Sequence, residues 1–392
     1  MRKINYVKLG NVCRVVSGST PKKSNTEYWG GDIPWITPAE IDNAAHYVWD
    51  TERHITELGV EKASLKELPV GTVLLSSRAP IGKVAITKTP MFCNQGFKNL
   101  ICSDQVLNEY LYRYLRANTA RLQSCGRGAT FKELSKKDVE NIILPLPSIS
   151  CQKNIVSKLE SIDNVILCLN RLLELFNDLV KSRFVEMFGN ADSSSANFNI
   201  STINEICSSI VRGPFGSALK KEFFIPRGVG TYKVYEQKHA IRKRADIGTY
   251  YISKEKFDSL KRFECKPGDI LMSCSGTMGE LYQLPMNCEP GIINQALCKF
   301  TLNEKILPEY FFRFMSQVVD DLGAKGSGIK NVSSVKYIKD IKIPLPPLSL
   351  QQEFAAFVHQ VDKLKFETQQ SIEKLQMLYD SLAQEYFAPE GD

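Results

Sequence analysis

Basic side chains that could hold a polyanion are concentrated in three short segments of this sequence. They are Lys22 with Lys23, Lys220 with Lys221, and the group Lys238, Arg242, Lys243 and Arg244. Lysine and arginine neutralise the backbone phosphates of nucleic acids, so each segment is a candidate contact for such a partner. Taken alone, each also fits an ordinary solvated surface patch. The formal net charge of +7 and the pI near 8.7 permit a polyanionic partner without requiring one.

No catalytic motif accompanies these basic segments. The sequence has no Gly-x-x-x-x-Gly-Lys-Ser/Thr loop, no His-Glu-x-x-His, no Gly-x-Ser-x-Gly and no Asp/Asn-Pro-Pro-Tyr/Phe of the amino-methyltransferases. The glycine-rich stretch Arg227-Gly-Val-Gly230 lacks the lysine and the helix of a phosphate-binding loop, and we interpret it as a turn. The 11 cysteines form no Cys-x-x-Cys pair and the chain has only 4 histidines, which favours reduced core thiols over a zinc site. We therefore expect no catalytic residue, metal or cofactor in this chain.

Length and composition are typical of a soluble protein of more than one domain. The chain has 392 residues, of which 43% are hydrophobic and 24% charged, and no apolar run approaches the roughly 18–20 residues of a membrane span. The first residues do not resemble a secretion signal. We expect two or three domains, no membrane contact and a cytoplasmic location.

The chain is a tandem repeat. Residues 107–115 (LNEYLYRYL) match residues 307–315 (LPEYFFRFM) at an offset of 200, and Asn94-Gln95 matches Asn294-Gln295 at the same offset. Residues 143–147 (ILPLP) match 342–346 (KIPLP) at an offset of 199, and residues 71–77 match 268–274 at 197. A period this long indicates duplicated domains rather than the short units of a solenoid.

Each half predicts the same order of elements. Runs rich in Val, Ile and aromatic residues, at 71–86 and 268–284, predict strands of a small mixed or mostly β domain. One helix is expected at 108–123, with Asn108 as its cap, and one at 308–322, with Pro308 at its start. The Pro-Leu-Pro segment that follows predicts an extended joint, because proline lacks the amide donor that a helix needs.

After each joint, apolar residues recur in the steps of four and three residues that are typical of a coiled coil. In the first such helix they are Ile155, Leu159, Ile162, Ile166, Leu169, Leu173, Phe176 and Val180. In the second they are Phe357, Val361, Leu364, Thr368 and, after a shift of one residue, Ile372, Leu375, Tyr379, Leu382 and Tyr386. We expect these helices to pair antiparallel, and a second strip, Leu172, Leu175 and Leu179, to pack against something else.

The predicted fold class is therefore α+β, with two tandem domains separated by two long antiparallel coiled-coil helices. The expected boundaries are 1–147 for the first domain, 148–190 for the central helix, 191–346 for the second domain and 347–392 for the C-terminal helix. A helix over residues 152–188 is about 55 Å long, more than the ~34 Å turn of B-DNA, which favours a spacer between two domains. A plain dimerisation coil is the alternative.

These repeated features resemble the specificity subunit of type I restriction-modification systems, over nearly the whole chain. The most specific marks are residues 141–147 (NIILPLP) with Gln152, and residues 340–347 (DIKIPLPP) with Gln351. Residues 31–36 (GDIPWI), 77–82 (SRAPIG), 275–279 (SGTMG) and the two Asn-Gln pairs are also similar to the family. The GDIPWI segment has no obvious mate in the second half, and Trp29, Trp35 and Trp49 all lie in the first.

The resemblance implies a division of labour among subunits. Two target recognition domains each read one half of a split target in double-stranded DNA, and the helices set the gap between the halves. Two methyltransferase (modification) subunits, which carry S-adenosylmethionine and methylate adenine, dock on the helices. Restriction/translocase subunits that use ATP and Mg²⁺ join them. Because the two halves of this chain differ, their half-sites should differ.

Base reading requires side chains that can form paired hydrogen bonds with base edges, whereas lysine and amides near glycines hold phosphates. The base-reading candidates are Arg78, Gln95, Lys98, Arg212, Lys238, Arg242 and Arg244. The phosphate-holding candidates are Lys22, Lys23, Arg127, Lys132, Lys220, Lys221, Lys325 and Lys330. For Gln95 and Gln295 a buried amide that fixes a strand end is an alternative, because base readers ought to differ between the halves. Trp35 is interpreted as a core residue rather than a wedge that reads DNA shape.

Two other classes of function remain open from the sequence. One is a coiled-coil scaffold that binds only protein. The other is the recognition part of a restriction-methylation fusion enzyme, for whose catalytic domain these 392 residues leave no room beside the repeats. Salt-dependent binding to duplex DNA separates the leading hypothesis from the scaffold, and methyl transfer by the isolated chain would favour the enzyme.

Overall fold

The protein folds into two compact units. The computed structural model describes residues 5–42, 45–78, 80–127, 132–189, 198–324 and 335–388. The first unit comprises residues 1–171 with 369–392, and the second comprises residues 172–368. Each unit therefore contains one repeat together with parts of both long helices. None of the described helices is long and apolar enough to cross a membrane.

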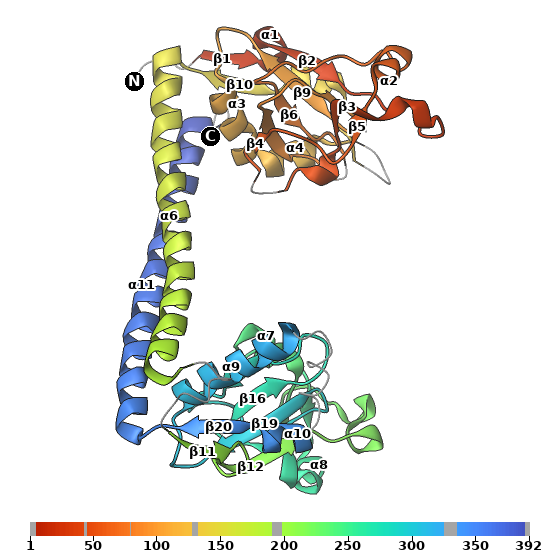
Figure 1. Ribbon diagram of the computed structural model, residues 1–392. Coiled ribbons are helices and arrows are strands. Elements are labelled where there is room, and N and C mark those ends of the chain that lie inside the picture. The colour runs from red at the N-terminus through yellow and green to blue at the C-terminus, as the bar shows by residue number, and fades with distance from the viewer. Residues whose placement is uncertain are drawn as a thin grey trace. The chain divides into compact units, whose positions relative to one another are not determined.

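The first unit is built on a five-stranded sheet of order β2-β9-β6-β7-β4 and a three-stranded sheet of order β5-β3-β8. Its strands are β1 (Asn5–Lys8), β2 (Cys13–Ser17), β3 (Trp29–Ile36), β4 (Tyr47–Val48), β5 (His54–Ile55), β6 (Val73–Leu75), β7 (Val84–Thr87), β8 (Phe92–Cys93), β9 (Lys98–Cys102) and β10 (Ile143–Leu146). Its short helices are α1 (Leu9–Val12), η1 (Thr26–Tyr28), η2 (Pro38–Glu40), α2 (Glu57–Lys62), α3 (Asn108–Ala117), α4 (Thr119–Cys125) and α5 (Lys136–Glu140). In Figure 1, α3 lies against the larger sheet.

The second unit repeats this arrangement, with sheets of order β12-β19-β16-β17 and β14-β13-β18-β15. Its strands are β11 (Asn199–Thr202), β12 (Cys207–Arg212), β13 (Tyr232–Tyr235), β14 (Tyr251–Ile252), β15 (Glu264–Cys265), β16 (Ile270–Ser273), β17 (Leu281–Gln283), β18 (Gly291–Ile293), β19 (Leu297–Leu302) and β20 (Lys342–Leu345). Its short helices are η3 (Gly216–Leu219), η4 (Lys221–Phe223), α7 (Gln237–Arg242), α8 (Lys254–Ser259), η5 (Lys261–Phe263), α9 (Pro308–Ala324) and α10 (Val335–Asp340).

The predicted repeat and the α+β fold class are confirmed by this shared topology. The paired strands β6 and β7 fall in the expected segment 71–86, and β16 and β17 fall in 268–284. The segment without an obvious mate, residues 31–36, has a structural one: β3 runs parallel to β8 as β13 runs parallel to β18. Strand equivalence has survived where sequence similarity has not.

The helix predicted at 108–123 is in fact two helices, α3 and α4. The break falls at Asn118, whose side-chain Nδ2 donates to the carbonyl oxygen of Tyr114 at 3.0 Å. Asparagine side chains compete with the backbone for such bonds and so favour helix ends. The expected cap at Asn108 is also wrong, because the N-cap position is Leu107. The Oε1 atom of Gln152 accepts the Leu107 amide at 2.9 Å instead.

Two helices of 40 residues, α6 (Ile149–Phe188) and α11 (Leu348–Phe387), follow the two proline joints. In the first unit, Ile155 and Leu159 of α6 pack in one cluster with Ala383 and Phe387 of α11. In the second unit, Phe184 and Phe188 near the end of α6 pack around Phe354 near the start of α11. The start of each helix therefore meets the end of the other, which confirms the antiparallel pairing (Figure 1).

The apolar stripe of α6 follows the prediction. All eight predicted positions from Ile155 to Val180 are buried or half-buried. The stripe of α11 differs: Leu364 is 46% exposed, and Lys365 is half-buried in its place. The stripe therefore runs without a shift through Phe354, Val358, Val361, Lys365, Thr368, Ile372, Leu375, Tyr379, Leu382 and Tyr386. The aliphatic stem of a lysine can cover apolar surface while its ammonium reaches water. A pattern built only from apolar residue types therefore misses the position of Lys365.

Candidate nucleic-acid interface

Loops from different strands meet at one edge of the first unit. Because β3 and β8 are parallel, their carboxyl ends lie at the same edge, and the Asn94 amide donates to the Ile36 carbonyl at 3.1 Å. The loop after β2 joins them, since the Ser19 amide donates to Cys93 at 3.0 Å. The loop after β6 joins through the Ser77 amide, which donates to Gly96 at 2.8 Å. We call residues 17–20, 76–78 and 94–96 the first loop edge.

The second unit brings the equivalent loops together. The Asn294 amide donates to the Tyr235 carbonyl at 2.9 Å, as Asn94 does to Ile36. The Gly213 amide donates to Leu297 at 3.0 Å, and the Cys274 amide to Ala296 at 2.7 Å. We call residues 212–216, 236–238, 273–276 and 294–296 the second loop edge. Each unit thus presents one cluster of loops built on the same strand ends.

Each loop edge depends on a glycine that no other residue could replace without moving the backbone. A Cβ atom on Gly18 would lie 1.9 Å from the carbonyl oxygen of Asn94, and one on Gly213 would lie 1.9 Å from that of Asn294. Contacts this short with backbone atoms are forbidden by van der Waals repulsion. The two glycines therefore hold the loops after β2 and β12 against the Asn-Gln turns.

The Asn-Gln pairs divide two tasks between them. The Oδ1 atom of Asn94 accepts the Gly96 amide at 2.8 Å, and that of Asn294 accepts the Ala296 amide at 3.0 Å. The asparagines therefore fix the turns. Gln95 and Gln295 are exposed, so the interpretation of a buried amide does not fit either glutamine. Gln95 accepts a hydrogen bond from the Thr20 hydroxyl and remains available to a partner at the surface.

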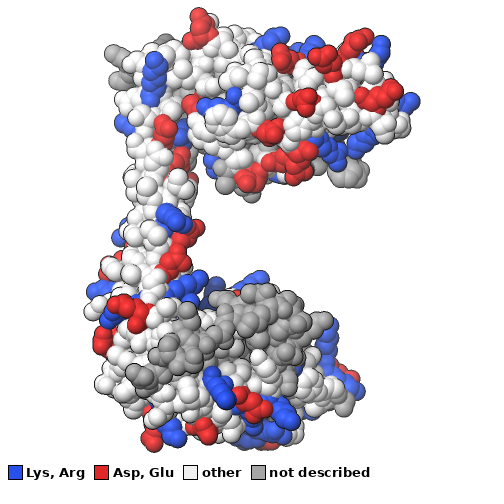
Figure 2. All heavy atoms as spheres, viewed as in Figure 1, with Lys and Arg blue, Asp and Glu red and all other residues white. Residues whose placement is uncertain are grey.

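The other candidates of the first unit differ in accessibility. Arg78 is half-buried and pairs as an isolated β-bridge with Glu133. Lys98 is only 8% exposed, and its Nζ lies 3.4 Å from both Glu133 Oε1 and Ser77 Oγ, so it helps to hold the loop edge together. The remaining basic candidates, which are exposed, are Lys22, Lys23, Arg127 and Lys132. Arg127 lies 3.6 Å from Asp138, and on the face shown in Figure 2 acidic and basic side chains are interspersed over this unit.

Most basic residues of the α7 segment carry acidic partners. Lys238 Nζ lies 2.6 Å from Glu236, and the Arg244 guanidinium forms two bonds with Asp246, the Nε bond being 2.9 Å long. These bonds lower the pKa of Asp246. Lys243 lies 2.6 Å from Glu280, whereas Arg242 is exposed at the end of α7.

The phosphate-holding candidates of the second unit fall in two places. Lys220 and Lys221 are exposed, with Lys220 3.6 Å from Glu222. Lys325 and Lys330 lie outside the described residues.

Arg212 is the one base-reading candidate of this unit that ends a strand at the loop edge. It is the last residue of β12, its Nε donates to the Gln295 carbonyl at 3.4 Å, and its guanidinium lies 4.9 Å from the ring centre of Phe215. Phe215 is 62% exposed. Phe215 was not among the residues predicted from the sequence. Its place in the Gly-Pro-Phe-Gly turn at residues 213–216 is the signal that could have identified it.

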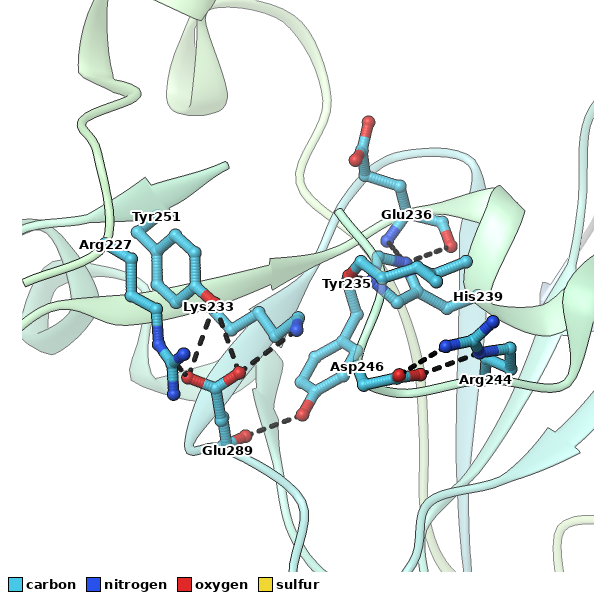
Figure 3. Close-up of polar contacts among 10 residues, drawn as sticks. Arg227, Lys233, Tyr235, Glu236, His239, Arg244, Asp246, Tyr251 and Glu289 are labelled. Atoms are coloured by element: carbon cyan, nitrogen blue, oxygen red, sulfur yellow. Dashed lines mark hydrogen bonds and ion pairs between the residues drawn. The ribbon is translucent and has the colours of Figure 1, made fainter. Parts of the chain in front are cut away.

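A polar network that the sequence did not reveal joins β13 and β14 to the segment before β18 (Figure 3). Lys233 is 1% exposed, and its Nζ lies 3.1 Å from Glu289, which also binds Tyr251 and Arg227. Burial raises the pKa of Glu289, but hydrogen bonding and the charge of Lys233 outweigh it, so the pKa is lowered overall. Removing one partner of such a buried ion pair is strongly destabilising.

His239 fixes the start of α7 through hydrogen bonds to the backbone. It is fully buried, its Nδ1 accepts the Glu236 amide at 2.8 Å, and its Nε2 donates to the Ile247 carbonyl at 2.7 Å (Figure 3). Burial lowers the pKa of His239, so the ring is neutral and can accept and donate at once.

Neither loop edge contains the constellation of an active site. Within the described ranges no group of three His, Cys, Asp or Glu side chains is placed to hold a metal ion. Trp35 is 1% exposed and donates from Nε1 to the Ser19 carbonyl at 3.1 Å, which confirms its interpretation as a core residue. The two edges share the same backbone hydrogen bonds between strand ends, which form a common frame, and apart from the two glutamines they present different side chains.

Comparison with known proteins identifies the family of this chain. The family model for the type I restriction modification DNA specificity domain matches residues 1–175 and 196–377. The chain belongs to this family, with one copy of the domain in each half.

Two specificity subunits from Methanocaldococcus jannaschii illustrate the range of similarity. The chain is 44% identical to that of the type I restriction enzyme MjaIX over 162 residues, which cover 41% of this chain and 38% of the relative. It is 24% identical to that of MjaVIII over 94% of this chain and 89% of the relative. With three of the curated relatives, among them the MjaIX subunit, the match spans less than half of the relative's own length.

Solved structures share the fold over the full length. A chain from a type I restriction-modification complex superposes with a TM-score of 0.67 at 19% identity, and 99% of each chain is covered. The specificity subunit from M. genitalium gives a TM-score of 0.51 at 16% identity, covering 99% of this chain and 98% of that one.

Proposed function

We propose that this protein is the specificity subunit of a type I restriction-modification complex and that each of its two units reads one half of a split DNA sequence. One observation carries the proposal: the same arrangement of strand ends occurs twice, and apart from the shared glutamines its surface side chains differ, with Ser17 and Thr20 in the first unit where Arg212 and Phe215 stand in the second. A frame that is kept while its surface changes is what a pair of readers for two different half-sites requires.

The frame also suits duplex DNA in its chemistry. Exposed glutamines occupy the same turn in both units, and exposed lysines or arginines flank each loop edge. Glutamine and arginine can discriminate base edges in the major groove, and lysine can hold phosphates. The predicted base-reading and phosphate-holding residues remain proposals on this basis. Lys98 is the weakest of them because it is buried.

We further infer that the chain acts without a catalytic site of its own. In this proposal two modification subunits supply S-adenosylmethionine and methyl transfer, and restriction subunits supply ATP- and Mg²⁺-dependent cleavage. The exposed strip Leu172, Leu175 and Leu179 of α6, between 36% and 47% exposed, would give the modification subunits an apolar surface. A protein that serves this purpose on chromosomal DNA would act in the cytoplasm.

The test measures binding to duplex DNA at a series of salt concentrations. The full chain, alone and with its modification subunits, is titrated against a pool of random duplexes and against the duplexes selected from it. We expect selection of a sequence with two specified parts, and an affinity that falls as salt rises. Selection of no sequence under any condition, with partners present, would leave the protein-binding scaffold as the better account.

A further inference from the structure

The register of the strands identifies which residues of the two loop edges are equivalent. Ser17, the last residue of β2, pairs with Lys98. Arg212, the last residue of β12, pairs with Cys298, which lies 200 residues after Lys98 and so at the repeat offset. Each is followed by the glycine that packs on an Asn-Gln turn. Arg212 therefore occupies in the second unit the place that Ser17 occupies in the first.

Two contacts hold the Arg212 side chain in one place. The ring of Phe215 lies under the guanidinium, 4.9 Å from centre to carbon, and the Gln295 carbonyl accepts from Nε at 3.4 Å. Both partners belong to the second loop edge, and Gly213 fixes the backbone between Arg212 and Phe215. A guanidinium stacked on an aromatic ring loses less rotational freedom on binding than one on a mobile side chain.

Core packing does not explain the position of the Phe215 ring. Phe215 is 62% exposed, so it contributes little to the core, and an exposed aromatic ring beside a cation is a frequent feature of binding surfaces. A planar guanidinium can donate two parallel hydrogen bonds, and in the major groove the matching pair of acceptors is O6 and N7 of guanine.

We propose that Arg212 reads a guanine in the half-site of the second unit and that Phe215 is the residue that positions it. The inference rests on the proposed function. The first unit has Ser17 and Thr20 at the equivalent places, with Thr20 bonded to Gln95 rather than stacked on a cation. The guanine requirement therefore belongs to one half-site. The exposed glutamines Gln95 and Gln295, whose amides match the paired donor and acceptor of adenine, occupy the same turn in both units and do not distinguish the half-sites.

The test is selection of duplexes by the full chain together with its modification subunits, with sequencing of the bound pool. Arg212→Gln should reduce the preference for guanine at one position of one half-site by roughly 10- to 100-fold and leave the other half-site unchanged. Ser17→Ala, at the equivalent place in the first unit, is the matched control and should leave that guanine preference intact. Equal melting temperatures of variant and parent show that the fold is retained.

Phe215 separates positioning from direct contact. Phe215→Ala should weaken the guanine preference at the same position and no other, and Phe215→Tyr should restore it because tyrosine also stacks on a guanidinium. If Arg212→Gln weakens binding to every sequence equally, Arg212 holds a phosphate and the proposal is wrong. The same conclusion follows if the variant selects the parental sequence with parental affinity. A parent that selects no sequence contradicts the proposed function itself.

Discussion

One buried glutamine near the start of each long helix bonds the helix to the strands and loops of its unit. Gln152 is fully buried; its Oε1 accepts the Leu107 amide, and its Nε2 donates to the carbonyls of Gln105 and Pro147, all at 2.9 Å. Gln351 makes the corresponding bonds to Leu307, Lys305 and Pro346 at 2.9, 3.2 and 2.9 Å. The sequence marked both glutamines by their repetition. Their partners lie up to 47 residues away, so the bonds could not be predicted.

Replacing either glutamine should destabilise the protein. Gln351→Leu leaves the backbone amide of Leu307 and the carbonyls of Lys305 and Pro346 without this partner, which we expect to lower the free energy of unfolding by about 2 kcal/mol. Urea unfolding followed by circular dichroism measures the change. Gln352→Leu is the matched control, because Gln352 is exposed and should leave the unfolding free energy within about 0.5 kcal/mol. Equal losses for both variants would contradict the proposed role of the buried amide.

His239 should make the second unit sensitive to acid. Its pKa is lowered from the ordinary 6.5 by burial, so the unfolded chain takes up the proton more readily than the folded one. The unfolding free energy should therefore be constant above about pH 6.5 with respect to this group and fall as the pH drops towards the lowered pKa. His239→Asn, which cannot be protonated, should flatten that part of the profile. An identical pH profile for the variant and the parent would contradict this account of His239.

Elements were predicted best where their pattern was long. Eight regularly spaced apolar residues identified α6, and the whole stripe is buried or half-buried as expected. The stripe of α11 was assigned to Leu364 because an apolar pattern cannot recognise a lysine stem such as that of Lys365. The break between α3 and α4 depended on one asparagine, and the pairing of Lys233 with Glu289 joins residues 56 apart. Long-range polar contacts leave no local signal.

The buried stripe of α6 should not tolerate charge. Ile166→Asp places a carboxylate on a half-buried apolar surface, which we expect to cost roughly 2–4 kcal/mol of stability and to impair assembly with the modification subunits. Leu167→Asp is the matched control at the neighbouring position, because Leu167 is 68% exposed. Thermal melting and co-purification with the modification subunits give the two measurements. If both variants behave alike, the assignment of the stripe is wrong.

The whole molecule is two copies of one domain joined through two 40-residue helices. At about 1.5 Å per residue each helix is roughly 60 Å long, which fits the proposal that the helices set the gap between two half-sites. The sequence predicted this organisation through its repeat. It could not supply the DNA sequence that is read, because similar frames carry different side chains at their loop edges.

Shortening both helices tests the spacing. Deleting residues 164–170 of α6 together with residues 370–376 of α11 keeps the heptad phase and removes about 10 Å, or about three base pairs. Each unit should keep its own base preferences, because its core is untouched. The gap in the selected sequence should shrink, or activity on the original site should be lost. An unchanged gap with full activity would show that the helices do not set the spacing.

The proposal that the chain has no catalytic site of its own is tested with the isolated chain. Incubation with labelled S-adenosylmethionine and duplex DNA should give no incorporation above background, and addition of the modification subunits should give methylation of adenine. The control is the same complex without this chain, which should methylate poorly or without sequence preference. Incorporation by the chain alone, lost on mutating one of its residues, would favour the fusion enzyme.

Each residue of a continuous helix adds both a rise along the axis and a rotation about it, and this limits which insertions the long helices can accept during evolution. One inserted residue in α6 moves everything beyond it by about 1.5 Å but also turns it by about 100°. Insertions of about four, seven or eleven residues come closest to whole turns and return the apolar stripe to its partner. We therefore expect the gap between half-sites to evolve by duplication or loss of short gene segments, in discrete jumps, while single-codon insertions in the helices are eliminated.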